Sequence, residues 1–248
     1  MIVWLASFPR SGNTLLRIIL NSAFGLSTST IYPGPKQGVN QVYDQMNQLI
    51  GDVDSTGTQD QLDADKEVHF LKTHELPATG DRRRAVYVVR DGRDALVSYA
   101  HFVRTFESDR YSASSFDENL EMLIRSCDQF GGWSRHAAAW SNRTAPTSVV
   151  RYEDLLIAPV DTVFASFPRL GVTLPGVSGS VPDFQALKAR IPGFFRKGQA
   201  GAWKTEMPAE LQKLFWSIHG EAMERFGYTP DGHFEPLWLR PIANEESR

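Results

Sequence analysis

The sequence predicts an α/β fold in which a central parallel β-sheet is flanked by helices. Three observations support this prediction. Short apolar runs alternate along the chain with longer segments of helical periodicity, as in folds built from strand–helix–strand units. The apolar runs are nearly continuous, which is typical of parallel strands buried on both faces. The first run passes through a tight loop directly into a helical segment, which is the P-loop-like layout of a phosphate-binding turn.

Four apolar runs are the expected strands, and each is followed by polar or charged residues. They are Ile2 to Ser7, Val68 to Lys72, Ala85 to Val89 and Ser148 to Arg151. Helical periodicity extends over five further segments. These are Asn13 to Phe24, Arg93 to Val103, Phe116 to Trp140, Leu155 to Leu170 and Glu210 to Phe226. The third helical segment should break near Gly131 and Gly132, because glycine weakens a helix interior.

The 248 residues are expected to form one domain that spans 1–248. Residues 27–65 are rich in Gln, Asn, Asp, Gly and Ser, and they predict loops with a short helix. Residues 172–182 read as a second loop. The polar tail at 240–248 is expected to fray.

Composition excludes several classes of protein. A net charge of -3 argues against bulk nucleic-acid binding, which needs a basic field. No apolar run is long enough to cross a bilayer, and the N-terminus lacks a basic leader, so we expect a cytoplasmic protein. The single cysteine, Cys127, excludes an internal disulfide and is expected to be a small buried residue in a helix. The six histidines show no ligand spacing, so no metal is expected.

Cations and hydrogen-bond donors follow every expected strand. The residues after the runs are Phe8 to Thr14, Lys72 to Glu75, Arg90 to Asp94, and Tyr152 to Asp154. Ligands of open parallel sheets bind beyond the carboxyl ends of the strands, and a helix N-terminus attracts anions. Each of these residues alone has a commoner structural role, such as a surface ion pair for Arg10. Their joint occurrence predicts a polyanionic ligand such as a nucleotide.

Four segments resemble the sulfotransferases that use 3'-phosphoadenosine 5'-phosphosulfate (PAPS), particularly those of the cytosolic type. They are SFPRSGNT from Ser7, LKTHELP from Leu71, VVRDGRDALVSYAHF from Val88 and RKGQAGAWK from Arg196. They occur in the order in which the family carries them, between about residues 2 and 205. The resemblance implies that PAPS is the sulfuryl donor, that PAP is the product and that no metal takes part.

The resemblance also implies a donor site. The loop would hold the 5'-phosphosulfate, Arg90 and Ser98 would bind the 3'-phosphate, and Tyr152 and Phe184 would lie beside the adenine. The loop residues are Arg10, Ser11, Gly12, Asn13 and Thr14, and a C-terminal clamp comprises Arg196, Lys197 and Gly198.

Catalytic roles follow from the same resemblance and agree with the chemistry. His74 would be the general base for the acceptor hydroxyl, because its ordinary pKa suits neutral operation. Lys72, two residues earlier on the same side of a strand, would contact the transferring sulfonate. Arg10 would stabilise the leaving oxygen. Many relatives have lysine at this position, and an arginine is a poor proton donor. Many also have a tryptophan that stacks on adenine where this chain has Leu15.

Two alternatives stay open at this point. A P-loop kinase would share the strand–loop–helix layout, although the G-x-x-x-x-G-K-[ST] pattern is absent. A catalytically silent nucleotide-binding module would need the phosphate ligands but not His74. The expected acceptor is a hydroxyl of a small molecule, a lipid or a glycoside, while its identity and the oligomeric state are left open. Its walls are expected in residues 27–65 and 102–116, which include Tyr32, Tyr43, Phe106 and Tyr111.

Overall fold

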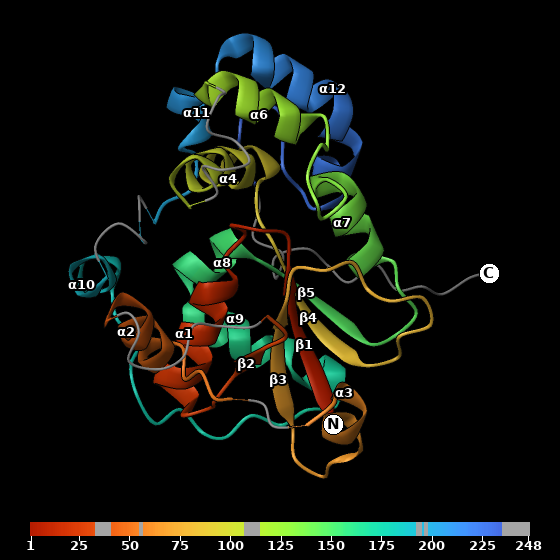
Figure 1. The fold of residues 1–248 in the computed structure, drawn as a ribbon, viewed down its shortest axis with the longest axis vertical. Helices are drawn as coiled ribbons and strands as arrows, with labels where there is room; N and C mark the ends of the chain where they lie inside the picture. The colour runs from red at the N-terminus through yellow and green to blue at the C-terminus, as the bar shows by residue number, and fades with distance from the viewer. Residues whose placement is uncertain (33–40, 55–56, 107–114, 192–194, 196–197, 235–248) are drawn as a thin grey trace.

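A five-stranded parallel β-sheet lies at the centre of the computed structural model, which describes residues 1–32, 41–54, 57–106, 115–191, 195 and 198–234 (Figure 1). The strand order is β2-β3-β1-β4-β5, and every neighbouring pair is parallel. The strands are β1 (Ile2–Ser7), β2 (Ser29–Thr30), β3 (His69–Thr73), β4 (Arg84–Val89) and β5 (Thr147–Arg151). The predicted fold class is therefore confirmed. The four predicted strands have their ends within one residue of the observed ones.

Helices cover both faces of the sheet (Figure 1). One group comprises α4 (Gly92–Phe106), α6 (Phe116–Ile124), α7 (Trp133–Ser141), α11 (Trp203–Glu206) and α12 (Ala209–Arg225). The other comprises α1 (Asn13–Phe24), α8 (Tyr152–Ile157), α9 (Pro159–Ser166) and the short 3-10 helix η1 (Pro168–Leu170). Three helices lie at the periphery: α2 (Gln41–Leu49), α3 (Gln59–Ala64) and α10 (Phe184–Arg190).

Alternation along β1 divides the core between the two faces. Ile2, Trp4 and Ala6 belong to the cluster that packs against α4, α6, α7 and α12. Val3 and Leu5 belong to the cluster that packs against α1, α8 and α9. Because successive side chains of a strand point to opposite faces, a strand buried on both sides is apolar at nearly every position. This is the physical origin of the continuous apolar runs.

Two predicted helices are divided in the structure. The segment 116–140 ends its first helix at Ile124 and resumes at Trp133, after Gly131 and Gly132 with φ of 81° and 82°. The segment 155–170 becomes α8, α9 and η1, because Pro159 begins α9 at its first turn, where a missing N–H costs nothing. Cys127 was expected to be buried in a helix, but it is exposed in the turn after α6.

Residues 27–65 hold more structure than the prediction of loops with one short helix. They contain β2, α2 and α3. The two-residue strand β2 pairs only with the end of β3, so it leaves no periodic pattern in the sequence. A capping box of Thr58 and Gln61 begins α3. The predicted frayed tail at 240–248 lies outside the described residues.

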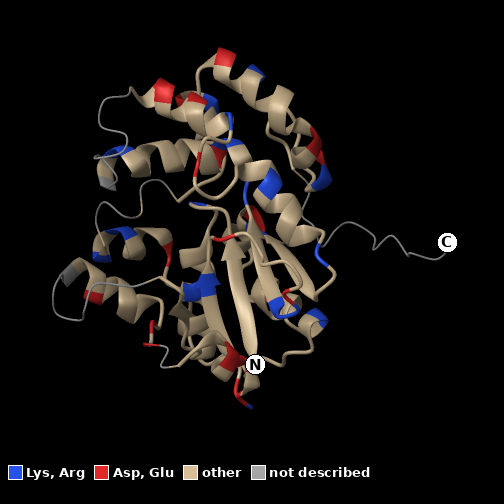
Figure 2. Ribbon diagram, turned by 45° about the vertical axis from the view of Figure 1, so that its right-hand side comes forward, with Lys and Arg blue, Asp and Glu red and all other residues tan. Residues whose placement is uncertain are grey.

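Charges of both signs are spread over the helices and around the sheet (Figure 2). Within the described part of the chain, no helix is long and apolar enough to cross a membrane.

Candidate active site

An open cleft of about 1810 Å³ lies beyond the carboxyl ends of the strands. Eleven of the predicted site residues line it, so the structure brings the separate strand ends together as expected for a parallel sheet. They are Arg10, Gly12, Asn13, Thr14, Lys72, His74, Arg90, Ser98, Tyr152, Phe184 and Gly198. Ser11 lies in the same loop but is buried. Arg196 and Lys197 fall outside the described residues.

The loop between β1 and α1 is a tight turn that closes against Tyr152. The Ser11 amide donates to the Phe8 carbonyl at 3.2 Å, and Gly12 has a φ of 107° that favours glycine. A Cβ atom on Gly12 would lie 2.5 Å from the Tyr152 ring. The Asn13 side chain is buried and donates to the Leu5 carbonyl at 2.8 Å. It therefore fixes the start of α1 to β1, and its side-chain NH₂ group is occupied within the protein.

His74 lies just beyond the end of β3 and is fixed as one tautomer. Its Nδ1 is 2.7 Å from the Ser7 carbonyl, which can only accept, so Nδ1 carries the proton. Nε2 is then an acceptor, and no hydrogen bond within the described residues uses it. Burial, and secondarily the charge of Lys72, lower the pKa of His74 well below its ordinary value. The imidazole is therefore neutral and has its acceptor nitrogen available at the cleft.

Lys72 lies two residues before His74, and its ammonium is 5.3 Å from the centroid of the Tyr32 ring. Burial lowers its pKa to about 8, and the nearby cations Arg17 and Arg10 add to this effect. Asp52 opposes it. A partly desolvated ammonium beside other cations has a strong electrostatic reason to bind an anion.

Arg10 lies within the loop, and Arg90 follows the end of the neighbouring strand β4. The Arg10 Nε donates to the Ser98 hydroxyl at 3.3 Å, and its guanidinium lies 5.2 Å from the Phe102 ring. Arg90 donates from Nη1 to the Arg10 carbonyl at 3.1 Å and lies 4.4 Å from the Tyr152 ring. The two predicted phosphate ligands, Arg90 just after β4 and Ser98 in α4, thus both form a hydrogen bond with Arg10.

Phe184 and Gly198 are in contact at the far end of the cleft. Gly198 has a φ of 60°, and a Cβ atom there would lie 1.9 Å from the Phe184 ring. Phe184 begins α10 after the N-cap Asp183, and its ring meets Phe195 edge-on. The Phe184 ring therefore lines the cleft in close contact with the backbone at Gly198. Leu15, at the position where many relatives carry a stacking tryptophan, also lines the cleft and offers it an apolar side chain.

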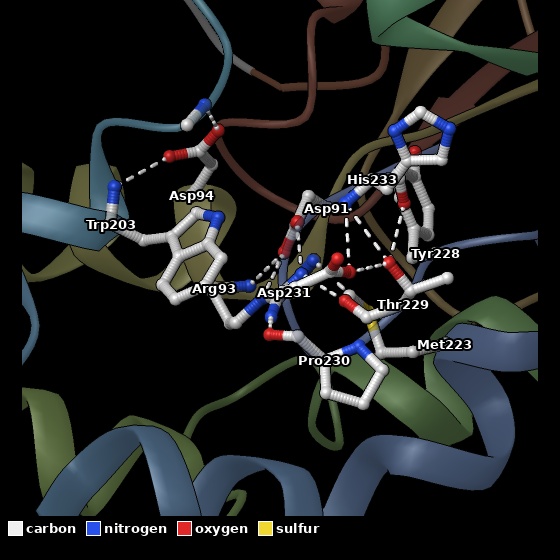
Figure 3. Close-up of polar contacts among 12 residues, drawn as sticks. Asp91, Arg93, Asp94, Trp203, Met223, Tyr228, Thr229, Pro230, Asp231 and His233 are labelled. Carbon is white, nitrogen blue, oxygen red and sulfur yellow. Dashed lines mark hydrogen bonds and ion pairs between the residues drawn. The ribbon is translucent and has the colours of Figure 1, made fainter. Parts of the chain in front are cut away.

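Helix α4 holds the C-terminal part of the chain at the site (Figure 3). The Asp94 carboxylate accepts from the backbone amides of Gly201 at 2.6 Å and Trp203 at 2.9 Å. Arg93 pairs with Asp91 at 2.7 Å, lies 3.7 Å from the Trp203 ring and donates to the carbonyls of residues 229 and 230. These contacts fix the segment that carries Gly198.

Glu153 connects the ends of β4 and β5 below the cleft. It is 2% exposed, and its carboxyl oxygens accept from the Asp91 amide at 3.1 Å and the Tyr228 hydroxyl at 2.7 Å. Burial raises its pKa from 4.5 to about 7. The group therefore supports the backbone next to Arg90 and Tyr152 from inside the protein.

Several residues at the site were not predicted. Phe130 and the ion pair of Arg17 with Asp52 line the cleft. Tyr32 and Tyr43, which were expected in an acceptor wall, also line it, whereas Tyr111 and the Phe106 side chain lie outside the described residues. Position after a strand and the family motifs are the signals behind the predicted residues, and Phe130, Arg17 and Asp52 carry neither signal. Among the described residues, no cluster of three or more His, Cys, Asp or Glu side chains could hold a metal ion.

A parallel sheet with cations gathered around a helix N-terminus at its carboxyl edge defines an α/β protein of the P-loop-like, phosphate-binding class. A model of the family described as "Sulfotransferase domain" matches residues 2–171. The chain belongs to this family.

Curated relatives and solved structures agree with this assignment. Cytosolic sulfotransferase 5 of Arabidopsis thaliana is 28% identical over 174 residues, which are 60% of this chain and 54% of that protein. Sulfotransferase 1A1 of Canis lupus familiaris is 26% identical over 64% of this chain and 63% of its own length. The chain thus spans less than two thirds of either relative.

Two crystal structures share the fold. Mouse sulfotransferase SULT7A1 complexed with PAP has a TM-score of 0.62 and 18% identity, and the match covers 90% of this chain and 84% of that one. Retinol dehydratase in complex with androsterone and PAP has a TM-score of 0.60 and 21% identity, covering 96% and 83%.

Proposed function

We propose that this protein is a sulfotransferase that moves the sulfuryl group of PAPS to a hydroxyl of a small-molecule, lipid or glycoside acceptor. The carrying observation is the geometry of His74, whose protonated Nδ1 is held by Ser7 and whose Nε2 is left available at the cleft two residues beyond Lys72. A phosphate-binding loop alone would serve a binding module equally well. A neutral imidazole beside the buried ammonium adds what group transfer needs.

In the proposed reaction the acceptor oxygen attacks the sulfur atom, and the bond from sulfur to the bridging phosphate oxygen breaks. The acceptor proton goes to His74 Nε2, and the leaving PAP keeps the electron pair of the broken bond. Lys72 neutralises charge on the sulfonate oxygens. Arg10 does so at the leaving oxygen, where it stabilises charge without giving up a proton.

The loop and its surroundings suit the donor. The Ser11 hydroxyl and the Arg90 Nε are buried and have no hydrogen-bond partner among the described residues, which favours a ligand rich in acceptor oxygens. Arg90 and Ser98 would bind the 3'-phosphate, with Arg196, Lys197 and Gly198 on its other side. Gly12, Asn13 and Thr14 would offer their amides to the 5'-phosphate, and Ser11 its hydroxyl. Tyr152 and Phe184 would border the adenine.

The small-molecule acceptor class is supported by relatives such as flavonol 3-sulfotransferase of Flaveria bidentis, which is 25% identical over 86% of this chain. Three aromatic residues that line the cleft, Tyr32, Tyr43 and Phe130, would form the wall beside the acceptor.

The deciding experiment transfers ³⁵S-sulfate from labelled PAPS to a panel of phenol, steroid, lipid and sugar hydroxyls in the presence of EDTA. We expect transfer to at least one class without added magnesium, tight PAP binding by calorimetry, and loss of turnover in Lys72→Ala and His74→Ala. His74→Ala should still bind PAP. A strict requirement for magnesium together with phosphate transfer would instead indicate a kinase, and PAP binding without transfer to any acceptor would indicate a silent module.

Arg10→Lys tests the residue that departs from many relatives. We expect it to retain PAP binding, because the positive charge is kept. Loss of binding would show that the planar guanidinium, which also donates to Ser98, is itself required.

A further inference from the structure

The backbone N–H and C=O of His74, which belong to successive peptide groups, each bind a side chain from a distant part of the chain. The amide donates to the Tyr32 hydroxyl oxygen at 2.7 Å, and the carbonyl accepts from His136 Nε2 at 2.9 Å. β3 ends at Thr73, so His74 lies beyond the ladder of the sheet. Side chains therefore supply at this residue the hydrogen bonds that a neighbouring strand supplies within a sheet.

His136 is fully buried in α7, and its tautomer follows from its partners. A carbonyl can only accept, so Nε2 carries the proton and Nδ1 accepts from the Tyr87 hydroxyl at 3.0 Å. Burial lowers the pKa of His136 to about 4, so the ring is neutral. The ring also meets Phe8 edge-on at 5.6 Å.

Tyr87 extends this chain of hydrogen bonds into the sheet. It lies in the middle of β4 and is fully buried, and the His136 ring that it contacts also meets Phe8, the first residue after β1. The order of hydrogen bonds is therefore Tyr87 hydroxyl, His136 imidazole and His74 carbonyl, with Phe8 against the imidazole. Each group has its donor and acceptor roles fixed by the next, which leaves one arrangement of protons.

We propose that His136 is a positioning residue for the base, and that with Tyr87 it forms a buried pair that sets the orientation of the His74 backbone relative to the phosphate-binding loop. This inference rests on the proposed function. Rotation of the backbone at His74 would move the imidazole away from the Ser7 carbonyl and turn Nε2 from the cleft. A displacement of about 1 Å in a reacting group can cost about 100-fold in rate.

His219 provides a matched control, because it makes the same type of contacts away from the cleft. It is buried in α12, its Nε2 is 2.8 Å from the Ile124 carbonyl, and its Nδ1 is 2.6 Å from the Ser134 hydroxyl. His136→Phe and His219→Phe each remove one buried donor from one backbone carbonyl. Only the first carbonyl belongs to the proposed base.

Steady-state kinetics and PAP calorimetry separate positioning from general damage. We expect His136→Phe to lower kcat by roughly 10- to 100-fold while the Kd for PAP stays within about twofold. His136→Gln places an amide donor near the lost Nε2 and should recover most of kcat. His219→Phe should lower the melting temperature but leave kcat of the folded protein within about twofold. Full kcat in His136→Phe, or equal kcat losses in the phenylalanine and glutamine variants, would overturn the inference.

Histidine NMR tests the same inference without turnover. In ¹⁵N-histidine-labelled protein, the signal that disappears in His74→Ala identifies His74, and we expect it to report a protonated Nδ1 and an unprotonated Nε2. In His136→Phe it should become a mixture of tautomers, whereas His136→Gln and His219→Phe should leave it unchanged. An unchanged signal in His136→Phe refutes the positioning role even if the protein proves to be a sulfotransferase. A changed signal in a protein that transfers no sulfuryl group would refute the proposed function alone.

Discussion

Replacing Glu153 by glutamine should remove a pH-dependent part of the stability. The glutamate is buried, and burial raises its pKa from 4.5 to about 7. The folded protein therefore holds a proton that the unfolded chain releases between these values, so the free energy of unfolding falls as pH rises across this window. One pKa unit corresponds to about 1.4 kcal/mol, so the whole effect is roughly 3 kcal/mol. Most of it, roughly 2 to 3 kcal/mol, falls between pH 5 and pH 8.

Urea unfolding at pH 5 and pH 8 measures this difference. Glu153→Gln has no proton to lose and keeps an oxygen for the Asp91 amide and an amide group for the Tyr228 hydroxyl. We therefore compare the free energy of unfolding of the variant with that of the unmodified protein at each pH. This difference should shift in favour of the variant by roughly 2 to 3 kcal/mol between pH 5 and pH 8. Glu210→Gln, at an exposed residue of α12, is the matched control and should show little change. If the difference between Glu153→Gln and the unmodified protein is the same at both pH values, the carboxyl is not titrating in this window and the reasoning is wrong.

Three further predictions concern the cleft. Because the pKa of Lys72 is lowered to about 8, kcat/KM for the donor should fall as pH rises through about 8, and Lys72→Arg should move this fall to higher pH. A pH profile that is the same for both proteins would assign the fall to another group. Gly12→Ala should weaken PAP binding, measured by calorimetry, at least about tenfold, because the new Cβ atom meets the Tyr152 ring. Gly80→Ala is the control and should leave PAP binding unchanged, because Gly80 also has a positive φ but has open space around it. Equal affinities in the two variants would contradict the close approach. Asp94→Asn leaves one oxygen for two backbone amides of the C-terminal segment, so PAP should dissociate about tenfold faster in stopped-flow measurements, and an unchanged rate would show that this contact does not retain the nucleotide.

The features that could be predicted from the sequence are local or periodic. The strands are recognisable because burial on both faces makes nearly every position apolar. Many of the site residues are recognisable because they directly follow strands, whereas Ser98, Phe184 and Gly198 were assigned from the resemblance to the family alone. The breaks in two helices were recognisable only in part, because glycines mark the first and Pro159 starts a new helix rather than ending one.

The remaining parts of the site depend on backbone groups from distant segments. The Ser7 carbonyl that fixes the His74 tautomer is 67 residues away, and His136 binds the same residue across 62 positions. A carbonyl has no signature in the sequence, and a buried histidine that binds one looks like any other histidine. Asp94 lies within one of the family motifs, but its hydrogen bonds to backbone amides 107 and 109 residues later could not be predicted. These bonds depend on how α4 and the C-terminal segment pack against each other.

The contacts of Arg93 and Asp94 with the C-terminal segment have a consequence for folding. These contacts join residues separated by 107 to 137 positions in the sequence. The partners of Arg93 and Asp94 in this segment all lie beyond residue 171, where the family match ends. Contacts of such separation are slow to form, because a long loop must close before any of them is gained. During synthesis the phosphate-binding loop, Lys72 and His74 all emerge long before the residues at 201–230 that complete this part of the site. We therefore expect a nascent chain that ends near residue 200 to have formed its β-sheet. It should bind the nucleotide only weakly, because residues 201–230 are not yet present.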